Sequence, residues 1–197
     1  MAAAIGTTAL VLTGCGGGGG DDGAVVEESS AAAVAGSRAV LQDAQGNEVG
    51  TVAFSEVSAG TEVRAEVQGL EPGFYGLHVH ETGLCEPDSS APGDPGRTGA
   101  FLSAGGHLGK DDAGHPGHAG DLTALYVTEG GLGSLTTVTD RFGVQDLVTD
   151  DDGSAVMIHS GPDNYANVPE RYAPGGPDQD TLGTGDAGSR LACGVVE

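Results

Sequence analysis

Apolar and polar residues alternate in short runs along most of the chain beyond residue 36, and turn-forming residues separate the runs. The run 61–68 shows this best, because three apolar side chains fall on one face and three charged ones on the other: Val63, Ala65 and Val67 against Glu62, Arg64 and Glu66. Alternation with a period of two is typical of a strand with one buried and one solvated face. The pattern therefore predicts an antiparallel sheet.

Eight segments fit this pattern and predict an all-β fold. They are residues 37–42, 48–57, 61–69, 74–81, 121–128, 134–140, 154–160 and 190–196. Two connections, 82–120 and 161–189, are long, lack periodicity and are rich in Gly, Pro and Asp. Loops of this length in a compact domain are mostly functional or disordered. Because the first contains three of the six histidines and Cys85, we expect two long functional loops attached to the sheet.

The composition favours the same fold class. The 197 residues include 37 glycines, and each glycine inside a helix costs roughly 1 kcal/mol relative to alanine. Seven basic residues against 29 acidic ones leave a formal net charge of −22, and Lys110 is the single lysine. Such a chain has no basic stripe that could neutralise phosphates. We therefore expect no nucleic-acid partner, and one domain with tails.

The amino-terminal segment looks like an export signal. Residues 2–12 are apolar, but they are much shorter than the roughly 20 residues that span a bilayer. They run into Leu12-Thr13-Gly14-Cys15, the pattern of a bacterial lipoprotein signal, which is cleaved before a cysteine that carries lipid. The basic region that opens such signals is missing, because Arg38 is the first positive residue. Either translation starts upstream or the segment is not a signal.

We expect a signal peptide at 1–14, a flexible Gly-rich acidic tether at 15–36 and a folded domain at 37–197. Lipidation would consume Cys15 and leave Cys85 and Cys193 as an even pair, whose disulfide an extracytoplasmic compartment permits. The expected location is therefore outside the cytoplasm, with a lipid on Cys15 as the only attachment to the cell membrane. The alternative is three unrelated thiols in a cytosolic protein, which would leave the Leu-Thr-Gly-Cys pattern unexplained.

Two histidines on one predicted strand suggest a metal site. In 74–81 the apolar side chains alternate with Gly76, His78 and His80, so both imidazoles project from the outer face and can converge on one metal. Such a pair taken alone is more often part of a solvated polar face. The remaining histidines strengthen the metal interpretation, together with one aspartate that follows them: His107, His115, His118 and Asp121 in and after the first long loop, and His159 at the end of 154–160.

Five separated segments match, in order, the motifs of one family. They are 76–80 (Gly-Leu-His-Val-His), 104–107 (Ala-Gly-Gly-His), 118–122 (His-Ala-Gly-Asp-Leu), 158–165 (from Ile-His to Asp-Asn-Tyr) and 185–194 (Gly-Asp-Ala-Gly-Ser-Arg-Leu-Ala-Cys-Gly). On these motifs the chain resembles copper,zinc superoxide dismutase in its bacterial secreted form, over about residues 37–197. The resemblance implies an eight-stranded Greek-key barrel or sandwich. It also implies bound copper and zinc and superoxide anion as the substrate, and it allows a homodimer.

By position in these motifs, the resemblance implies two metal sites that share one histidine. The copper ligands would be His78, His80, His107 and His159. The zinc ligands would be His107, His115, His118 and Asp121. Asp163 would link one copper ligand to one zinc ligand through their outer ring nitrogens, which fixes the orientation of both imidazoles.

The resemblance also implies roles for an arginine and two cysteines. Arg190 would be the active-site arginine beside copper, where a guanidinium stays charged and offers several donors to a small anion. Cys193 would pair with Cys85 and so tie the first long loop to the last strand. In the family mechanism copper takes an electron from one superoxide and gives it to a second. The bridging imidazole, here His107, takes up a proton and returns it as peroxide forms.

One departure from the family pattern concerns the attraction of the substrate. Gly183 stands where many family members carry a lysine that guides the anion, and the net charge of −22 repels superoxide at long range. Within a Debye length of about 8 Å the metals and Arg190 should still dominate. We therefore expect weak long-range attraction of superoxide, with the reaction at the metals retained.

A second departure concerns zinc, because only Pro116 and Gly117 separate His115 from His118. A related bacterial branch with an equally short loop has lost zinc ligands, so a copper-only centre is the alternative. Pro followed by Gly is the signature of a type II turn, whose first and fourth Cα atoms lie within about 7 Å. Such a turn lets both imidazoles reach one ion, and we therefore expect zinc to be retained.

Two other classes of function compete with an enzyme. A non-catalytic lipoprotein could store or deliver copper on the same scaffold, although it would have no use for an anion-binding Arg190. A structural or adhesive β-sandwich would leave all six histidines incidental. Superoxide dismutation accounts for both Arg190 and the six histidines, and it is the function that we expect.

Overall fold

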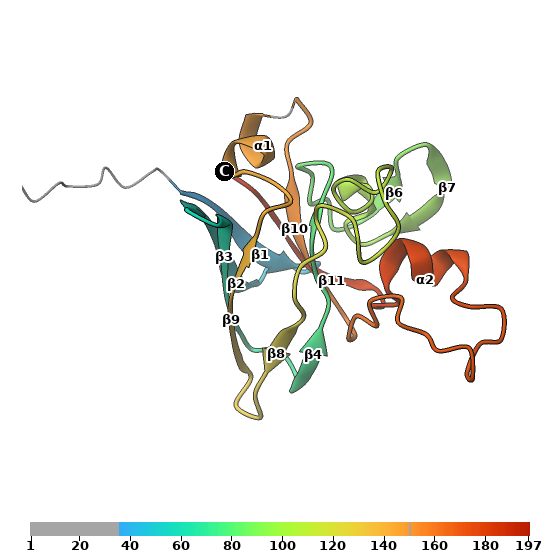
Figure 1. The fold of residues 1–197 in the computed structure, drawn as a ribbon. Coiled ribbons are helices and arrows are strands. Elements are labelled where there is room, and N and C mark those ends of the chain that lie inside the picture. Colours follow the sequence, from blue (N-terminus) through green and yellow to red (C-terminus); the bar gives the residue numbers. More distant parts are fainter. Residues whose placement is uncertain (1–35, 150) are drawn as a thin grey trace, which may run out of the picture. The chain divides into compact units, whose positions relative to one another are not determined.

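In the computed structural model, the described residues are 36–149 and 151–197. Most of the strands form one nine-stranded antiparallel sheet (Figure 1), in the order β4-β8-β9-β3-β2-β1-β11-β10-β5. These strands are β1 Ser37–Asp43, β2 Glu48–Val57, β3 Gly60–Gln68, β4 Gly73–Tyr75, β5 Leu77–His80, β8 Leu125–Val127, β9 Leu132–Thr139, β10 Ala155–His159 and β11 Arg190–Val195. The predicted signal segment, Cys15 and the tether up to residue 35 lie outside the described residues.

Strands β4 and β5 lie at opposite ends of this order, although only Gly76 separates them in the chain. The chain thus passes from one edge of the sheet to the other and nearly closes a barrel. The Gly76 N–H donates to the Gly161 carbonyl at 2.8 Å, and the Gly76 carbonyl accepts from the His159 N–H at 2.9 Å. A side chain would not fit, since a Cβ atom at Gly76 would lie 2.7 Å from the Ala187 Cβ. The single strand predicted at 74–81 is therefore two strands.

Two connections cross over to a strand that is not the neighbour in the sheet. Strand β3 pairs with β2 and β9, but the chain continues from β3 to β4. Strand β10 follows β9, yet it pairs with β5 and β11. These crossovers are those of a Greek-key barrel, so the predicted fold class is confirmed.

Every predicted segment contains a strand, but the segment 121–128 is shorter in the structure. Asp121 forms only an isolated bridge with His78, and the regular strand begins at Leu125. The sequence pattern does not predict helix α1 (Val144–Thr149), a single short helix that buries Val144 and Leu147. Each of these differences lies where the chain leaves the sheet.

The barrel interior holds one apolar core. Its members alternate along the strands as the sequence pattern predicts; they include Leu41, Val52, Phe54, Val63, Ala65, Leu77, Val79, Leu125, Val156 and Ile158. Burying a side chain of this size contributes about 1.5–3 kcal/mol. The barrel is therefore a rigid support for whatever its outer face carries.

The outer face of β5 is not solvated, because the two long loops cover it. His78 is 0% exposed and His80 is 1% exposed. The first loop contains the hairpin of β6 (Ser89–Ala91) and β7 (Asp94–Gly99) and the short helix η1 (Leu102–Ala104), and the second contains α2 (Gln179–Thr184). Figure 1 shows this hairpin and α2 on the same side of the barrel. The histidines thus lie between the barrel and its loops.

A disulfide joins the first loop to the last strand, which confirms the predicted pairing. The Cα atoms of Cys85 and Cys193 are 5.6 Å apart. Cys193 packs in a second, smaller apolar cluster with Phe101 and Met157, beneath the first loop. The bond therefore holds the loop against β11 next to Arg190.

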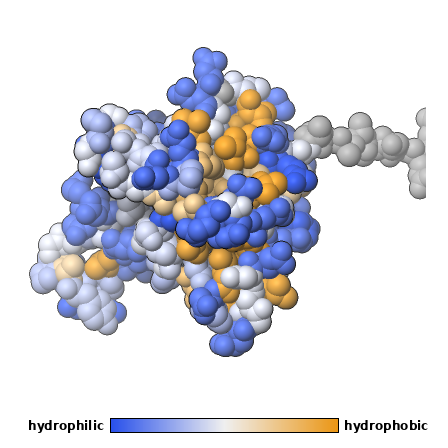
Figure 2. Space-filling model, turned by 180° about the vertical axis from the view of Figure 1, so that it is seen from behind, coloured by the Kyte–Doolittle hydropathy of each residue, from blue (hydrophilic) through white to orange (hydrophobic). Residues whose placement is uncertain are grey.

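The molecular surface is largely polar. Hydrophilic residues cover most of the face shown in Figure 2, and hydrophobic residues gather in smaller patches between them. Neither α-helix in the described part of the chain is long and apolar enough to cross a membrane.

Replacing both cysteines should destabilise the protein strongly. The disulfide closes a loop of 108 residues, for which the chain-entropy model gives about 4 to 5 kcal/mol of unfolding free energy. We predict a loss of this order for the double variant Cys85→Ser/Cys193→Ser, measured by urea unfolding of the metal-free protein. Unchanged stability would show that the bond does not hold the loop to β11.

Candidate metal centre

Strand β5 carries His78 and His80 on the face opposite the core, because neighbouring side chains of a strand alternate. In each of these two imidazole rings, one nitrogen contacts an oxygen atom of the protein. His78 Nε2 lies 2.7 Å from Asp163 Oδ2, and His80 Nδ1 lies 3.0 Å from the Gly105 carbonyl oxygen. The other two nitrogens, His78 Nδ1 and His80 Nε2, are buried without a hydrogen-bond partner.

Two further imidazoles complete this first cluster. His107 lies beside β5 and forms an isolated bridge with His80. His159 ends β10, the neighbour of β5, and its buried Nε2 also has no hydrogen-bond partner. One ring nitrogen from each of the four histidines lies within 4.8 Å of the others. The structure thus brings together all four residues predicted to bind copper.

This cluster has the properties of a metal site. Buried polar atoms without partners are costly, yet three such nitrogens converge here. Burial lowers the pKa of His78 to about 4 in spite of Asp163, and burial and the neighbouring His78 lower the pKa of His159 to about 3. Burial and the nearby Arg190 keep the pKa of His80 well below its ordinary value. The imidazoles of His78, His80 and His159 are therefore neutral at physiological pH, which is the form that binds copper or zinc.

A second cluster contains His107, His115, His118 and Asp121. Asp121 Oδ1 lies 2.7 Å from His107 Nδ1, 3.1 Å from His115 Nδ1 and 3.2 Å from His118 Nδ1. His107 Nδ1 and His118 Nδ1 are 3.3 Å apart. In a tetrahedral zinc site with bonds of about 2.0–2.1 Å, neighbouring ligand atoms are about 3.3 Å apart. The four distances are close to this spacing, so the three nitrogens and one oxygen are candidate ligands of one zinc ion.

His78 also lies close to this second cluster, since a ligand atom from each of His78, His107, His115 and Asp121 falls within 4.8 Å of the others. However, His78 Nε2 is bound to Asp163, which leaves only Nδ1, and the first cluster needs that atom. By contrast, the contacts of His118 Nδ1 are with His107 and Asp121, which belong to the second cluster. We therefore take His118 as the fourth ligand of the second cluster.

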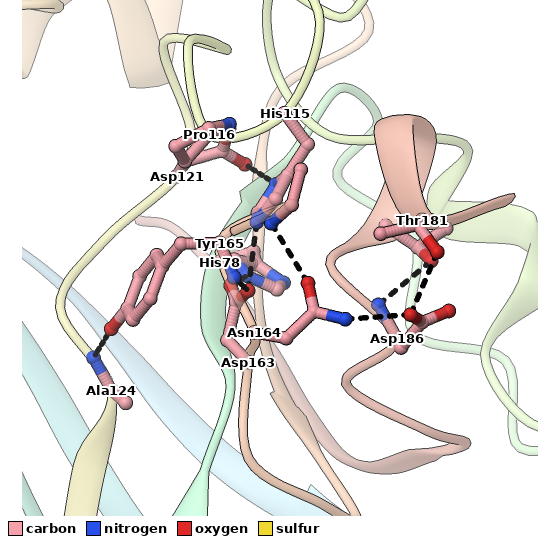
Figure 3. A network of polar contacts seen from close by, with 12 residues as sticks. His78, His115, Pro116, Asp121, Ala124, Asp163, Asn164, Tyr165, Thr181 and Asp186 are labelled. Atoms are coloured by element: carbon pink, nitrogen blue, oxygen red, sulfur yellow. Dashed lines mark hydrogen bonds and ion pairs between the residues drawn. The ribbon is translucent and has the colours of Figure 1, made fainter. Parts of the chain in front are cut away.

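Asp163 connects the two clusters (Figure 3). Its Oδ2 lies 2.7 Å from His78 Nε2, and its Oδ1 lies 2.8 Å from His115 Nε2. Burial raises the pKa of Asp163, but the hydrogen bonds to His115 and His78 outweigh it and hold the pKa well below the usual range. The carboxylate is therefore ionised and accepts a hydrogen bond from the Nε2–H of each ring. This leaves Nδ1 of both histidines free for a metal, as the sequence analysis expects.

Two charged partners act on His115. Burial lowers its pKa, but close contacts with Asp121 and Asp163 raise it overall, to about 9. The pKa of Asp121 is raised by burial but lowered more by His107 and His115, so it stays well below the usual range. In the metal-free protein His115 therefore carries a proton that a zinc ion would displace.

The turn between His115 and His118 differs from the predicted type II turn. The hydrogen bond runs from the Gly117 N–H to the Gly114 carbonyl at 2.7 Å, so the turn begins one residue earlier and Pro116 is its third residue. The His115–Pro116 peptide bond is cis, which is the arrangement of a type VI turn. Both imidazoles nevertheless reach Asp121, so the predicted convergence holds although the predicted turn type was wrong.

Arg190 lies at the opening of the first cluster. Its Nη1 donates to the Phe101 carbonyl and its Nη2 to the Gly105 carbonyl, the same oxygen that His80 contacts. A pocket of about 810 Å³ is lined by Arg190, His80, His107 and His159 among others. Burial and the nearby Arg97 lower the pKa of Arg190 to about 10. The guanidinium is therefore charged at neutral pH and faces the space that the histidines border.

The second long loop holds Asp163 through contacts that the sequence analysis does not assign. In Figure 3, Asn164 Nδ2 donates to Asp186 Oδ2 at 2.6 Å, and Thr181 Oγ1 donates to the same oxygen at 2.8 Å. Gly185 (φ 62°) packs so tightly that a Cβ atom would lie 2.0 Å from Asp163 Oδ1. The sequence signal for Gly185 was its place in the motif 185–194, but only the fold reveals what it contacts.

The unusual pKa values predict a stability optimum for the metal-free protein near pH 6.5. Below that pH the unfolded chain protonates its histidines before the folded protein does, so His78 and His159 should each cost on the order of 2 kcal/mol by pH 4.5. His115 acts oppositely, since its contribution is complete below pH 6.5 and is lost as the pH rises through 9. Urea unfolding at pH 4.5, 6.5 and 9 measures the expected loss of stability on the acidic and on the alkaline side. Greater stability at pH 4.5 than at pH 6.5 would contradict the lowered pKa values of His78 and His159.

Comparisons with known proteins agree with the geometry. A family model described as copper/zinc superoxide dismutase matches residues 48–196. The chain is 45% identical over 166 residues to the Cu-Zn superoxide dismutase of Mycolicibacterium paratuberculosis, which covers 79% of this chain and 71% of that protein. It is 32% identical to the Escherichia coli K12 protein of the same name, over 80% of this chain and 84% of that protein.

The fold is also similar to that of a solved copper/zinc superoxide dismutase. The Cu/Zn superoxide dismutase from Brucella abortus aligns with a TM-score of 0.61 and 32% identity, over 82% of this chain and 99% of that chain. The match of the family model covers the barrel from β2 to β11 and contains all six histidines. The chain therefore belongs to the copper/zinc superoxide dismutase family.

Proposed function

We propose that this protein converts superoxide and protons into oxygen and hydrogen peroxide. The observation that carries the proposal is the set of three buried, unpartnered imidazole nitrogens beside a pocket that also holds a charged arginine. Membership of the family supports the same reaction. Two superoxide anions and two protons give one oxygen and one hydrogen peroxide, so the reaction needs a one-electron carrier, a site for a small anion and a proton donor.

The one-electron carrier is copper, which we assign to His78, His80, His107 and His159. Bound there, copper supplies a redox couple that accepts an electron from one superoxide and returns it to another. We assign zinc to His107, His115, His118 and Asp121, where it would hold one ring nitrogen of His107 without redox chemistry. A metal binds deprotonated ligands, which are imidazoles alone for copper, and imidazoles with the ionised carboxylate of Asp121 for zinc.

Arg190 is the residue that we assign to binding the anion. Its guanidinium borders the same pocket as three of the proposed copper ligands. The carbonyls of Phe101 and Gly105 orient it, and donors that are fixed in advance need no reorganisation when substrate arrives. Because arginine remains protonated through the working pH range, the attraction does not depend on pH.

His107 is the residue that we assign to proton transfer. Its Nδ1 faces Asp121 and His118, so Nε2 is the atom left for the first cluster and for the pocket that His107 lines. Imidazole is the side chain that exchanges a proton most readily near neutral pH. A proton held at Nε2 would be available where peroxide forms.

Charge around the pocket offers little long-range attraction. Gly183 lines the pocket without a charge, and the ammonium of Lys110 contacts the Glu81 carboxylate. The lining also includes a further cation, Arg97, but Asp180 and Asp186 lie in the same lining and offset it. We therefore propose that capture of superoxide depends mainly on short-range attraction by Arg190 and the metals, within a Debye length of about 8 Å.

Two substitutions test the assignment by their contrast. His80→Ala should remove copper and activity together, with a loss of activity of more than about 100-fold, because a metal ligand is gone. Arg190→Ala should keep copper and slow the reaction by at least about tenfold, because only anion attraction is lost. Copper content by elemental analysis and superoxide consumption measure the two effects, with Arg64→Ala as a control for loss of a positive charge. Full activity in His80→Ala would contradict the copper assignment, and full activity in Arg190→Ala would contradict the role given to Arg190. A wild type that binds copper but consumes no superoxide would favour a copper store.

We also propose that the protein lies outside the cytoplasm, attached to the membrane by a lipid on Cys15. The pattern Leu-Thr-Gly-Cys at 12–15 and the disulfide Cys85–Cys193 support this location, since disulfides persist in oxidising compartments. Mass spectrometry of the membrane-fraction protein should find a chain that begins at a lipid-modified Cys15. A soluble, unprocessed chain that begins at Met1 would contradict the proposal.

A further inference from the structure

Arg141 contacts the short turn that carries two of the proposed zinc ligands. Its Nη1 donates to the Pro116 carbonyl oxygen at 2.8 Å and to the His118 carbonyl oxygen at 3.0 Å. Among the described residues, no other side chain donates to these two oxygens. A single guanidinium therefore joins both ends of the segment from Pro116 to His118.

The position of Arg141 is itself well defined by the barrel. It lies two residues beyond the end of β9, and the next residue, Phe142, is buried in the main core against Phe54. The buried hydroxyl of Thr61, on β3, donates to the Phe142 carbonyl oxygen at 2.9 Å. The backbone that carries Arg141 is thus fixed to the core, and its side chain extends this rigidity to the turn.

The turn has little other support on this side. His115 is held from the inside, because its N–H donates to the Leu182 carbonyl at 2.8 Å and its Nε2 contacts Asp163. By contrast, Pro116 borders an open surface hollow of about 520 Å³ together with Arg141 and Tyr165. Without Arg141, the Pro116–His118 segment would be anchored mainly by the contacts of His118 with Asp121.

We propose that Arg141 is a positioning residue for the second metal. By holding the Pro116 and His118 carbonyls, it keeps the His118 imidazole where its Nδ1 faces His107 Nδ1 and Asp121 Oδ1. The inference rests on the proposed zinc site and explains how so short a connection between His115 and His118 retains a zinc-binding geometry. Hydrogen bonds that orient a metal ligand from outside typically contribute 10- to 100-fold to metal affinity.

The sign of the effect separates positioning from simple electrostatics. A positive charge near a cation site repels the metal, so removing it by Arg141→Gln should strengthen zinc binding if charge alone matters. Positioning predicts the opposite, because the carbonyls lose their donor and the turn is no longer held. Arg141→Lys keeps the charge and part of the donor capacity, and it should restore part of the affinity.

The test measures zinc affinity of the copper-loaded protein by competition with a chromophoric chelator. We expect Arg141→Gln to bind zinc about tenfold or more weakly than the wild type, with unchanged copper content, and Arg141→Lys to lie between the two. Arg64→Gln, which removes an exposed arginine on β3, is the matched control and should equal the wild type. His118→Ala removes a proposed zinc ligand, and its zinc affinity gives the lower limit for the comparison. Cobalt substituted for zinc should also show an altered tetrahedral absorption spectrum in Arg141→Gln.

Three outcomes would overturn the inference. Zinc affinity of Arg141→Gln equal to that of Arg64→Gln would show that the contact does not position His118. Tighter zinc binding would assign Arg141 a purely electrostatic effect. Equal thermal destabilisation of the metal-free and zinc-loaded forms of Arg141→Gln would assign it a general structural role. A wild type that binds no zinc would contradict the proposed zinc site as well, whereas a wild type that binds both metals but consumes no superoxide would contradict the proposed function alone.

Discussion

The structure depends on burying six imidazoles and two carboxylates between a barrel and its loops. Each of the proposed ligands His78, His80 and His159 contacts a protein oxygen with one ring nitrogen and keeps the other buried and free. A buried nitrogen without a partner is unfavourable in the metal-free protein, so the free energy of metal binding offsets a cost that folding alone incurs. The fold and the metals are therefore coupled.

The rest of the architecture holds those protein oxygens in place. Gly76 lets the chain cross between the sheet edges, which brings β4 and β5 into one barrel and presents His78 and His80 outward. The disulfide ties the first loop to β11, and the Gly105 carbonyl in that loop orients both His80 and Arg190. Asp163 then joins the two clusters across the second loop. Rigid positioning of this kind is what a site for rapid electron and proton transfer requires.

Much of the fold could be predicted from the sequence, because alternation in runs such as 61–68 directly reports one buried face. The candidate ligands were predictable because five separated motifs occur in the order of one family, whereas His-Val-His alone would more often be part of a solvated strand face. The turn at Pro116 was not predictable, because the same dipeptide suits two turn types and the turn contacts residues distant in sequence, Leu182 and Arg141. The burial of the outer face of β5 and the role of Arg141 depend on segments distant in sequence, which no local pattern reveals.

Anomalous X-ray scattering at the copper and zinc absorption edges, from crystals of the metal-loaded protein, tests the central claim most directly. The account predicts one copper peak among His78, His80, His107 and His159, and one zinc peak among His107, His115, His118 and Asp121, with His107 shared. A single metal peak, or a second peak bound by His78 in place of His118, would contradict the account.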